Sequence, residues 1–405
     1  MTLTLPIKRL ANVTLGKMIQ SEPSQLVDTS APYLRAAHVQ PHGRIIDLPD
    51  QRMWFSQFEL RTLNLLRGDV VVVEGGAGYG RSAVIREDLA GWGFQNSIIR
   101  LRPVAARSDG RFLDYSLQGA LSDGRIELAT STATLPHFTA DKVSKFEIWA
   151  PALDEQRAIA DYLDRETAQI DALVAKQEEF IRLLRERRRA AIENRLTSVD
   201  ARRTSVRHLA RLVSGSGFPV REQGQVGKEL PFYKVKDLKT GRQSGMLDLP
   251  ENSVSRDTAQ ALSASVIPSG SVAFAKVGAA LLLGRVATLP VDSCVDNNMS
   301  ALVPRTGFDP GFARYVMLTF DFKRHVLPGP VPSLDMDGLR AFRVPVLSLN
   351  KQRAIVNDLD EQTSRIDTLI AKTEEHIALA KERRSALITA AVTGQFDVRT
   401  AGKAG

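Results

Sequence analysis

The chain has little of what disulfides, metal sites and membrane spans require. Cys294 is its only cysteine, so an internal disulfide and a cysteine-rich zinc site are both excluded. Its six histidines are scattered, and Pro41 separates the one close pair, His38 and His42. No apolar run approaches the ~18 residues of a membrane span, and the N-terminal MTLTLPIKRL lacks the apolar core of a signal peptide. We therefore expect a cytoplasmic protein with no metal, no cofactor and no membrane contact.

Motifs for chemistry on nucleic acids are also missing. No Pro-Pro pair occurs, although amino-methyltransferases use an Asn/Asp-Pro-Pro-aromatic stretch to cradle the flipped adenine. VSGSGFP at 213–219 has the glycines of a cofactor loop, but proline and polar residues follow where a helix is needed. The nearest fragment of a nuclease carboxylate cluster is Asp237-x-Lys239, which is too short to be informative. We predict no catalytic residue.

Residues 69–84 read DVVVVEGGAGYGRSAV and come close to a P-loop. Gly75, Gly80 and Ser82 fit the pattern G-x-x-x-x-G-K-[ST], but Arg81 stands in place of its lysine. The residues after Ser82 are strand-like, whereas a P-loop needs a helix there. The matching stretch at 270–288, GSVAFAKVGAALLLGRVAT, keeps glycines but loses the spacing. The pair of stretches therefore predicts a glycine turn between two strands.

Two long segments of the chain repeat each other. Residues 153–197 and 349–393 align without gaps and are identical at roughly half of their positions. Neither contains glycine or proline, and Ala, Leu, Glu, Arg and Lys dominate, so each is expected to form one helix of about 60 Å. The first should end near 197–200, and Gly394 suits the C-cap of the second.

Apolar residues of both segments recur at intervals of three and four, which is the spacing of a coiled-coil seam. The predicted seam consists of Ile159, Leu163, Ile170, Leu173, Phe180 and Leu184 in the first segment, and Ile355, Leu359, Ile366, Leu369, His376 and Ala380 in the second. A second ridge follows at Val174, Ile181, Ile370 and Ile377. A lone helix of this length cannot bury its stripe, so we predict that the two helices pack against each other rather than each on its own globule.

The repeat extends beyond the helices. Residues 6–16 resemble 205–215, and 95–103 resemble 296–304, so the chain is built as globule, helix, globule, helix. Strand-like runs such as VVVVE and SVAFAK alternate with helical stretches such as 309–327, which makes the fold class α+β. The expected parts are a globule at 1–152, a helix at 153–199, a globule at 200–346, a helix at 347–397 and a flexible tail at 398–405.

The charge favours an acidic partner. Lys and Arg number 54 against 46 Asp and Glu, a net charge of 54 − 46 = +8, which suits nucleic acid. Phosphates are bound by Lys and Arg, and base edges by Arg, Asn, Gln and Ser. The candidate DNA-binding residues are Arg35, His38, Gln40, Arg44, Tyr79, Arg81 and Arg111 in the first globule, and Lys234, Lys236, Lys239, Arg242, Lys276 and Arg285 in the second. Any one of them can equally be a solvated surface charge.

The repeated stretches QRAIADYLDRETAQIDALVAKQEEFIRLLRERR and QRAIVNDLDEQTSRIDTLIAKTEEHIALAKERR closely resemble the conserved helical regions of the specificity subunit of type I restriction–modification enzymes. The resemblance covers nearly the whole chain. It implies two target recognition domains, each reading one half of a split site in double-stranded DNA, separated by an antiparallel coiled coil. It also implies that the helices bind two adenine-methyltransferase subunits, to which restriction subunits with endonuclease and translocase activity add.

Charged residues of the helices are kept in both copies. Glu178, Glu179, Glu186, Arg187 and Arg188 recur as Glu374, Glu375, Glu382, Arg383 and Arg384. They can be solvated pairs that support the helices, or a surface repeated twice for two identical partner chains. Two other functions stay open at this point: a coiled-coil scaffold with protein-binding globules, and a nucleotide-binding enzyme that uses residues 75–82.

Overall fold

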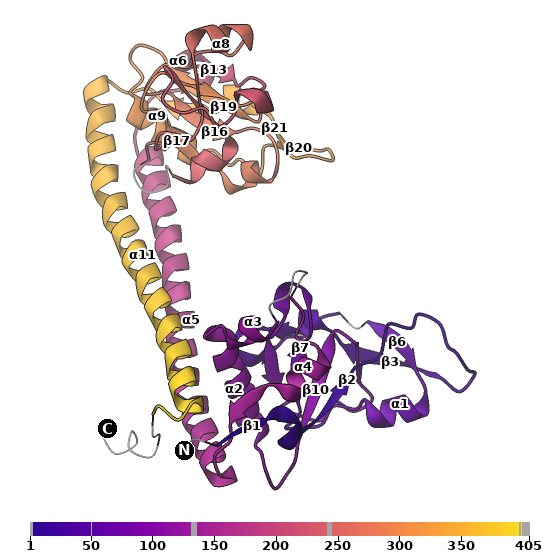
Figure 1. Cartoon of the computed structure of the whole chain (residues 1–405). Helices are drawn as coiled ribbons and strands as arrows, with labels where there is room; N and C mark the ends of the chain where they lie inside the picture. The colour runs from indigo at the N-terminus through magenta and orange to yellow at the C-terminus, as the bar shows by residue number, and fades with distance from the viewer. Residues whose placement is uncertain (1–2, 50, 131–135, 241–244, 397, 399–405) are drawn as a thin grey trace. The chain divides into compact units, whose positions relative to one another are not determined.

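The computed structural model describes all residues except 1–2, 50, 131–135, 241–244, 397 and 399–405 (Figure 1). The chain divides into two compact units. The first comprises Met1–Gln177 and Glu375–Gly405, and the second comprises Glu178–Glu374. Each unit therefore contains one globule together with a part of each long helix.

A four-stranded antiparallel sheet forms the centre of the first globule. Its strands lie in the order β2 (Ala11–Leu15), β10 (Ile98–Pro103), β7 (Val70–Val73) and β8 (Ser82–Val84). The four valines of β7 are all buried: Val70 and Val72 pack in a core with helix residues such as Leu113, while Val71 and Val73 pack in a second core with residues of smaller strands such as Leu34. β-Branched residues suit such a strand. The predicted strand in VVVVE is thus confirmed as a central strand.

Smaller elements complete the first globule. β3 (Thr29–Leu34) pairs antiparallel with β6 (Arg52–Phe55) and parallel with β9 (Gly93–Phe94), and β1 (Thr4–Pro6) pairs with β11 (Glu147–Trp149). A short hairpin joins β4 (Val39–Gln40) to β5 (Arg44–Ile45). The helices are η1 (Ile7–Arg9), η2 (Ala36–His38), η3 (Pro41–Gly43), α1 (Gln57–Thr62), η4 (Gly76–Gly78), α2 (Gly110–Ser122), α3 (Arg125–Thr130) and α4 (Ala140–Lys145).

The second globule repeats this topology. Its main sheet has the order β13 (Ala210–Ser214), β19 (Met299–Pro304), β16 (Val272–Ala275) and β17 (Val286–Thr288). β14 (Leu230–Tyr233) pairs antiparallel with β15 (Ser253–Val254) and parallel with β18 (Cys294–Val295), and β12 (Arg203–Ser205) pairs with β22 (Arg343–Pro345). The same strand order and the same parallel pair in both globules confirm the internal repeat and the α+β class.

The remaining elements of the second globule are α6 (Val206–Leu209), η5 (Val220–Glu222), η6 (Val235–Lys239), α8 (Arg256–Ala261), η7 (Ala279–Leu283), α9 (Pro310–Leu318), α10 (Met336–Ala341), β20 (Val326–Leu327) and β21 (Ser333–Leu334). The helix predicted at 309–327 is therefore too long. Asp309 caps its first turn by accepting a hydrogen bond from the Phe312 N–H at 3.0 Å, but the helix ends at Leu318 and a turn follows.

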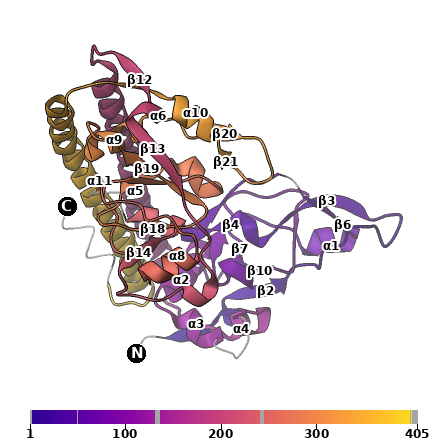
Figure 2. The same cartoon turned by 90° about the horizontal axis from the view of Figure 1, so that it is seen from above.

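The two long helices are α5 (Leu153–Thr197) and α11 (Leu349–Val392), as predicted. They lie side by side in both views (Figures 1 and 2). In the second unit, Arg185, Arg188 and Arg195 of α5 form ion pairs with Glu374, Asp367 and Asp358 of α11, so the two helices run antiparallel. In the first unit, Arg384 of α11 pairs with Asp171 of α5. Gly394 follows α11 with φ +74°, and the Gln395 N–H reaches the Ala390 carbonyl, which is a Schellman cap.

Burial along the long helices departs from the predicted seam in the middle of the helices. Ile159, Leu163, Leu184, Ile355, Leu359 and Ile366 are buried and Ile170 is half-buried, but Leu173, Phe180 and Leu369 are exposed. The second ridge lies inside instead, with Val174, Ile181 and Ile377 buried. The true seam of α5 runs through Ile170, Val174, Gln177, Ile181, Leu184 and Arg188 in alternating steps of four and three. Two of those positions are polar, so an apolar pattern alone misplaces the row.

A buried glutamine joins each globule to its helices. The side-chain oxygen of Gln156 accepts a hydrogen bond from the Asp109 N–H at 3.1 Å, and its amide donates to the carbonyls of Arg107 at 3.0 Å and Pro151 at 2.8 Å. Gln352 makes the same three bonds, each of 2.8 Å, with the Asp309 N–H and the carbonyls of Gly307 and Leu347. The glutamine therefore recurs in the repeat for a structural reason. It hydrogen-bonds the start of each long helix to the loop that precedes α2 in the first globule and α9 in the second.

A tyrosine of each globule makes a second repeated contact. The Tyr115 hydroxyl donates to Asp164 at 2.8 Å and lies 3.2 Å from the Thr167 hydroxyl. Tyr315 makes the equivalent bonds with Asp360 at 2.5 Å and Thr363 at 3.2 Å. All four residues on the long helices come from the aligned repeats. Sequence reasoning missed these anchors, although identical polar residues at buried heptad positions were the available signal.

Candidate nucleic-acid interface

The glycine-rich stretch forms a turn in both globules. In the first, η4 lies between the antiparallel strands β7 and β8, and Gly76 and Gly80 have φ values of +78° and +76°. In the second, η7 lies between β16 and β17, and Gly278 and Gly284 flank it with positive φ. A strand follows each turn, so neither has the helix N-terminus that a P-loop offers to phosphate. The predicted glycine turn is confirmed.

A second turn of the first globule lies against this hairpin. Residues 40–44 connect β4 to β5, and both His42 and Gly43 have φ +67°. A Cβ atom on Gly43 would lie 2.6 Å from the Gln118 Nε2 and 2.9 Å from the Asp114 Oδ2 of α2. Only glycine permits this close approach together with a left-handed backbone. The turn is therefore seated directly on polar side chains of α2.

Four of the predicted DNA-binding residues gather around this turn. Gln40 and Arg81 line a cavity of about 190 Å³, and Arg44 and Arg111 line a neighbouring cavity of about 540 Å³. His42, Gly43, Gln118 and Arg384 border both cavities. Residues far apart in the sequence thus meet at one place on the first unit, where strand ends, α2 and the long helices come together.

Asp114 places a titratable group beneath the turn. Its carboxylate is buried, and it accepts hydrogen bonds from the Ser82 hydroxyl at 2.6 Å and the Gln118 amide at 3.0 Å. Burial raises the pKa of Asp114 to about 6, against the opposing effect of these hydrogen bonds. The floor of the turn therefore carries a carboxyl that exchanges its proton close to neutral pH.

Arg111 serves the fold in this structure. Its guanidinium forms ion pairs with Asp161 at 2.7 Å and Asp164 at 2.9 Å on α5. These carboxylates raise its pKa against the effect of burial. Because its charge is already matched by two acids, we reassign Arg111 from a DNA contact to a residue that fixes α2 on the long helix.

Three other candidates of the first globule lie partly or wholly inside it. His38 is buried, and its ring packs edge-on against Trp92 with 6.1 Å between the centroids, so it is not on the surface. Its Nδ1 lies 3.1 Å from the Arg35 N–H, and Arg35 itself is half-buried. Tyr79 is half-buried and packs against the hydrophobic core. The prediction for His38 is therefore corrected, because burial leaves it no access to a base edge.

Three of the predicted lysines, at positions 234, 236 and 239, lie close together in the second globule, and two of them have local partners. Lys234 hydrogen-bonds to Gln223 and lies over the Phe218 ring, 5.3 Å from its centroid, and Lys236 pairs with Glu251 at 2.7 Å. Lys239 is exposed. Lys276 and Arg285 are half-buried on either side of η7, and burial lowers the pKa of Lys276 while Asp296 opposes that shift. Arg242 lies outside the described residues.

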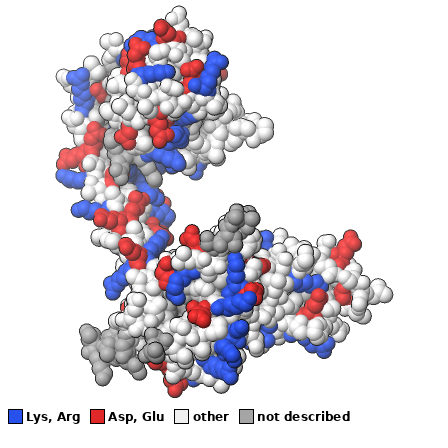
Figure 3. Space-filling model, in the orientation of Figure 1, with Lys and Arg blue, Asp and Glu red and all other residues white. Residues whose placement is uncertain are grey.

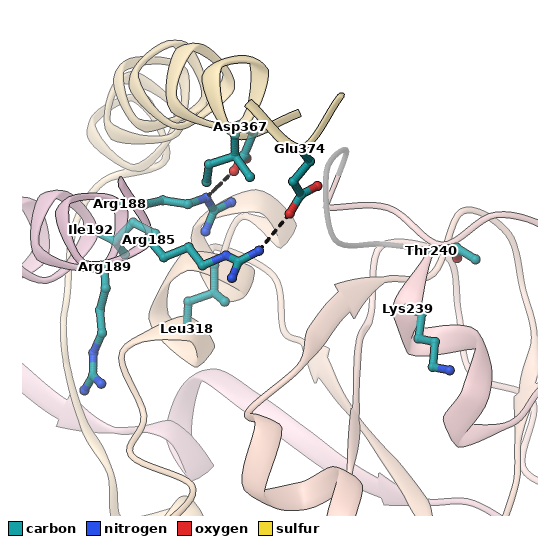
Figure 4. A pocket seen from close by; sticks show the side chains of 10 residues that line it. Arg185, Arg188, Arg189, Ile192, Lys239, Thr240, Leu318, Asp367 and Glu374 are labelled. Carbon is teal, nitrogen blue, oxygen red and sulfur yellow. Dashed lines mark hydrogen bonds and ion pairs between the residues drawn. The ribbon is translucent and has the colours of Figure 1, made fainter. Parts of the chain in front are cut away.

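Lys239 borders a cavity of about 520 Å³ within the second unit (Figure 4). The opposite wall belongs to the long helices, where Arg188 contacts Asp367 at 2.9 Å and Arg185 contacts Glu374 at 2.8 Å. Arg189 extends away from these two pairs in the same view. The cavity therefore combines matched charge pairs with an exposed lysine.

Acidic and basic side chains alternate along the long helices, and basic side chains gather in a strip on the visible face of the first globule (Figure 3).

Among the described residues, no three His, Cys, Asp or Glu side chains come together as a metal site would require. No helix in the described part of the chain combines the length and the hydropathy needed to cross a membrane.

Two solved structures match the chain over nearly its whole length. One is a chain from a structure on the complex assembly and conformational transition of a type I R-M system; it is 15% identical, with a TM-score of 0.75, and the match covers 97% of this chain and 98% of that one. The other is the HsdS subunit from Thermoanaerobacter tengcongensis, 16% identical, with a TM-score of 0.53 and 97% of each chain covered. No protein-family model and no curated protein matches. The chain has the HsdS fold, which confirms at the level of fold the resemblance carried by the repeated helices.

Proposed function

We propose that the chain, which has this fold, is the DNA sequence-recognition subunit of a type I restriction–modification complex, and that it acts in the cytoplasm. One observation carries the proposal: two globules of identical strand order are fastened to the same repeated helices by the same buried bonds, yet they differ at their turns. Such a chain holds two unlike reading surfaces on one repeated support. Each globule reads one half of an asymmetric split site in double-stranded DNA.

The two globules differ at their turns. The first presents Gln40, Arg44 and Arg81 around the 40–44 turn, whereas the second presents an apolar tip in η7 and exposed Lys239. Amide and guanidinium groups hydrogen-bond base edges, while lysines favour phosphates. We infer that the halves of the site are unlike in sequence. The long helices set the distance between the two globules. Two modules that read the same face of duplex DNA lie one helical turn apart, about 34 Å, or a multiple of that distance.

Exposed leucines of the long helices support the binding of two methyltransferase subunits. Leu173 and Leu369 are aligned in the repeat and are 48% and 47% exposed; Leu183 and Leu379 are also aligned and are 48% and 55% exposed. Each unit contains one member of each pair, Leu173 and Leu379 in the first and Leu369 and Leu183 in the second. A helix that only separated two globules would need no such repeated apolar side chains in water. They form the same anchor twice, as two identical partners require.

The repeated charges carry less of this argument than the sequence indicates. Arg188 and Arg384 are used between the helices, in ion pairs with Asp367 and Asp171, and Glu374 pairs with Arg185. The two arginines are largely buried in these pairs and so are not offered to a partner chain, whereas the exposed Arg185–Glu374 pair contributes little energy. The restriction subunits then join the methyltransferase-bound complex, and all catalysis lies in the partners.

The proposal is tested by co-expressing the chain with an adenine-methyltransferase partner of this class in cells that lack adenine methylation, and sequencing the methylated sites. We expect one split motif with an unread gap. Replacing residues 1–150 with the first globule of another specificity subunit should change one half of the motif only. A change in both halves, or methylation without sequence preference, would contradict the reading of one half by each globule.

The docking surface is tested separately with Leu173→Asp, Leu369→Asp and the double variant, using native mass spectrometry of the chain with its methyltransferase partner. We expect two bound partners for the wild type, one for each single variant and none for the double variant. Leu128→Asp, at a leucine of the first globule that is 79% exposed, is the matched control and should bind two. If the chain retains specific, salt-sensitive DNA binding but no variant changes the stoichiometry, the leucine surface is wrong; a coiled-coil scaffold would instead show no salt-dependent retention on DNA.

A further inference from the structure

We propose that His42 is a positioning residue, which fastens the 40–44 turn to Arg384 of α11 and thereby fixes Gln40 and Arg44 for DNA reading. The purpose of this contact rests on the proposed function, whereas the contact itself does not. The Nη1 of Arg384 lies 3.3 Å from the Nδ1 of His42, although the two residues are 342 positions apart in the chain.

The turn needs such a fastening because its backbone is unfavourable. His42 and Ser263 are the only described residues other than glycine with positive φ, and His42 is followed by a glycine in the same left-handed region. Left-handed conformation is disfavoured for a residue with a Cβ, so an unrestrained turn would relax to another shape. A residue held in this way marks a place where surrounding contacts determine the conformation.

Two supports act on the turn from different sides. Gly43 lies against Asp114 and Gln118 of α2, as described above. On the other side, Arg384 is 5% exposed and is itself fixed by a 3.0 Å ion pair to Asp171 of α5. Arg384 therefore cannot swing away to follow the turn. The turn is held between a helix of its own globule and the pair of long helices.

The fastening depends on the proton of His42. Arg384 has only donors, so the Nδ1 of His42 must be the acceptor, which requires the neutral ring. The groups that face the ring are Arg384 and Lys381 of α11, Asp171 of α5 and Arg44 of β5, with Asp114 of α2 beneath the next residue. Burial and Arg384 lower the pKa of His42, and Asp171 opposes them. The contact is therefore present at neutral pH and is lost as pH falls through the pKa of His42, which lies below the ordinary histidine value of about 6.5.

The second unit lacks this contact among its described residues. Arg188 is the residue aligned with Arg384, and its described hydrogen bonds go to Asp367. Its side chain is 19% exposed and borders the cavity with Lys239 and Thr240. The described contact belongs to the first reading surface, so disrupting it should affect the half-site that this surface reads.

The geometry is tested by amide hydrogen exchange of the full chain, without DNA. His42→Gly accepts the left-handed backbone but has no acceptor, whereas His42→Asn tolerates that backbone and retains a carbonyl oxygen for Arg384. We expect amides of residues 43–46 to exchange at least 10-fold faster in His42→Gly and at nearly the wild-type rate in His42→Asn. After correction for intrinsic exchange, the wild type should also accelerate between pH 7.5 and 5.5, and His42→Asn should not. His42→Gly exchanging as slowly as the wild type would overturn the proposal.

The purpose is tested by fluorescence anisotropy at pH 7.5, with duplexes that carry the split motif intact or with either half scrambled. His42→Gly should lower discrimination at the half read by the first globule at least 10-fold and leave the other half unchanged, and His42→Asn should restore it. His208→Ala is the matched control, because that exposed histidine accepts a hydrogen bond from its neighbour Arg207 at 3.3 Å and fastens nothing distant. Unchanged first-half discrimination in His42→Gly overturns the positioning role. A wild type that discriminates neither half refutes the proposed function, while hydrogen exchange still decides the fastening.

Discussion

The first and second units place opposite charges under equivalent turns. α2 and α9 align through Asp109 and Asp309 at their N-caps, and this alignment sets Asp114 of the first against Arg314 of the second. Gly43 lies against Asp114, and Gly245 lies against Arg314, where an added Cβ atom would be 2.5 Å from the guanidinium carbon. Both glycines have positive φ. Both units therefore have a glycine of positive φ at this place, but the side chain against it is an aspartate in the first unit and an arginine in the second.

The arginine that binds the aspartate of the long helix also lies at a different position in each unit. Asp164 of the first unit binds Arg111, and its aligned partner Asp360 binds Arg314 at 3.1 Å. Arg111 and Arg314 differ by three positions in the aligned helices, which is about one turn. The long helices therefore keep a fixed acidic anchor, and the globules reach it from different residues. This comparison teaches that the two units share the helical support and differ in the side chain beneath each turn.

The largest expected effect breaks the shared support. Gln156→Leu in the first unit and Gln352→Leu in the second each leave one N–H and two carbonyls buried without partners. We expect each change to lower the free energy of unfolding of its own unit by about 4 kcal/mol. Hydrogen exchange followed by residue assigns the loss to a unit. Equal losses spread over both units for either variant would show that the two anchors are not independent.

A slightly smaller effect tests the corrected seam. Ile181→Ala and Ile377→Ala remove aligned, buried side chains, and each should cost about 3 kcal/mol in thermal or denaturant unfolding. Phe180→Ala, at the neighbouring exposed position, is the control and should change the free energy of unfolding by less than about 0.5 kcal/mol. A costly Phe180→Ala together with a neutral Ile181→Ala would restore the seam that the sequence predicted.

The buried carboxyl of Asp114 predicts a pH dependence for the stability of the first unit. The pKa of Asp114 is about 6 when folded and lies near its usual 3.8 when unfolded, so the folded state binds more protons between these values. This carboxyl therefore stabilises the first unit below about pH 4 and loses that contribution, on the order of 3 kcal/mol, as pH rises from about 4 through 6. The lowered pKa of His42 gives stability the opposite dependence on pH. The free energy of unfolding is therefore measured for the wild type and for Asp114→Asn from pH 4 to 7.5, and the two values are subtracted at each pH. A flat difference would show that Asp114 is ionised throughout.

The smallest effect compares the two arginines between the helices. Arg384 is 5% exposed and Arg188 is 19% exposed, and their acids Asp171 and Asp367 are aligned. Arg188→Met should cost about 2 kcal/mol and Arg384→Met about 1 kcal/mol in urea unfolding, because Asp367, at 17% exposed, is left as a more buried unpaired charge than Asp171, at 47% exposed. The reverse order would mean that burial of the remaining acid does not set the cost.

Much of the fold follows from sequence periodicity, and little of the site does. The long helices, the glycine turns and the repeated order of elements come from local signals, such as the absence of glycine and proline or the four valines of β7. The seam between Ile170 and Leu184 fails because Gln177 occupies an interior position, and the helix after Asp309 ends early because tertiary packing overrides its pattern. These errors concern polar residues placed by contacts that no local pattern records.

The candidate site illustrates the same limit in charges. The sequence supplies Arg111, His38 and Lys236 as basic residues, but their partners Asp161, Trp92 and Glu251 are distant in sequence, and only the fold brings them together. Gln40, Arg44 and Arg81 retain their prediction because their surroundings leave them at the border of open cavities. The sequence gives no sign of the role of His42, since its partner Arg384 comes from a segment 342 positions away.

The division of the long helices between units has a consequence for synthesis. The second unit is one continuous segment, Glu178–Glu374, whereas the first needs Glu375–Gly405 to complete it. Ile159 and Leu163 of α5 pack with Ile388 and Val392 of α11, which leave the ribosome after the whole second unit. The globule made first is therefore finished last, and an apolar face of the nascent chain stays uncovered while some two hundred residues are added. Truncation near residue 375 should spare the second unit and leave the first prone to aggregation.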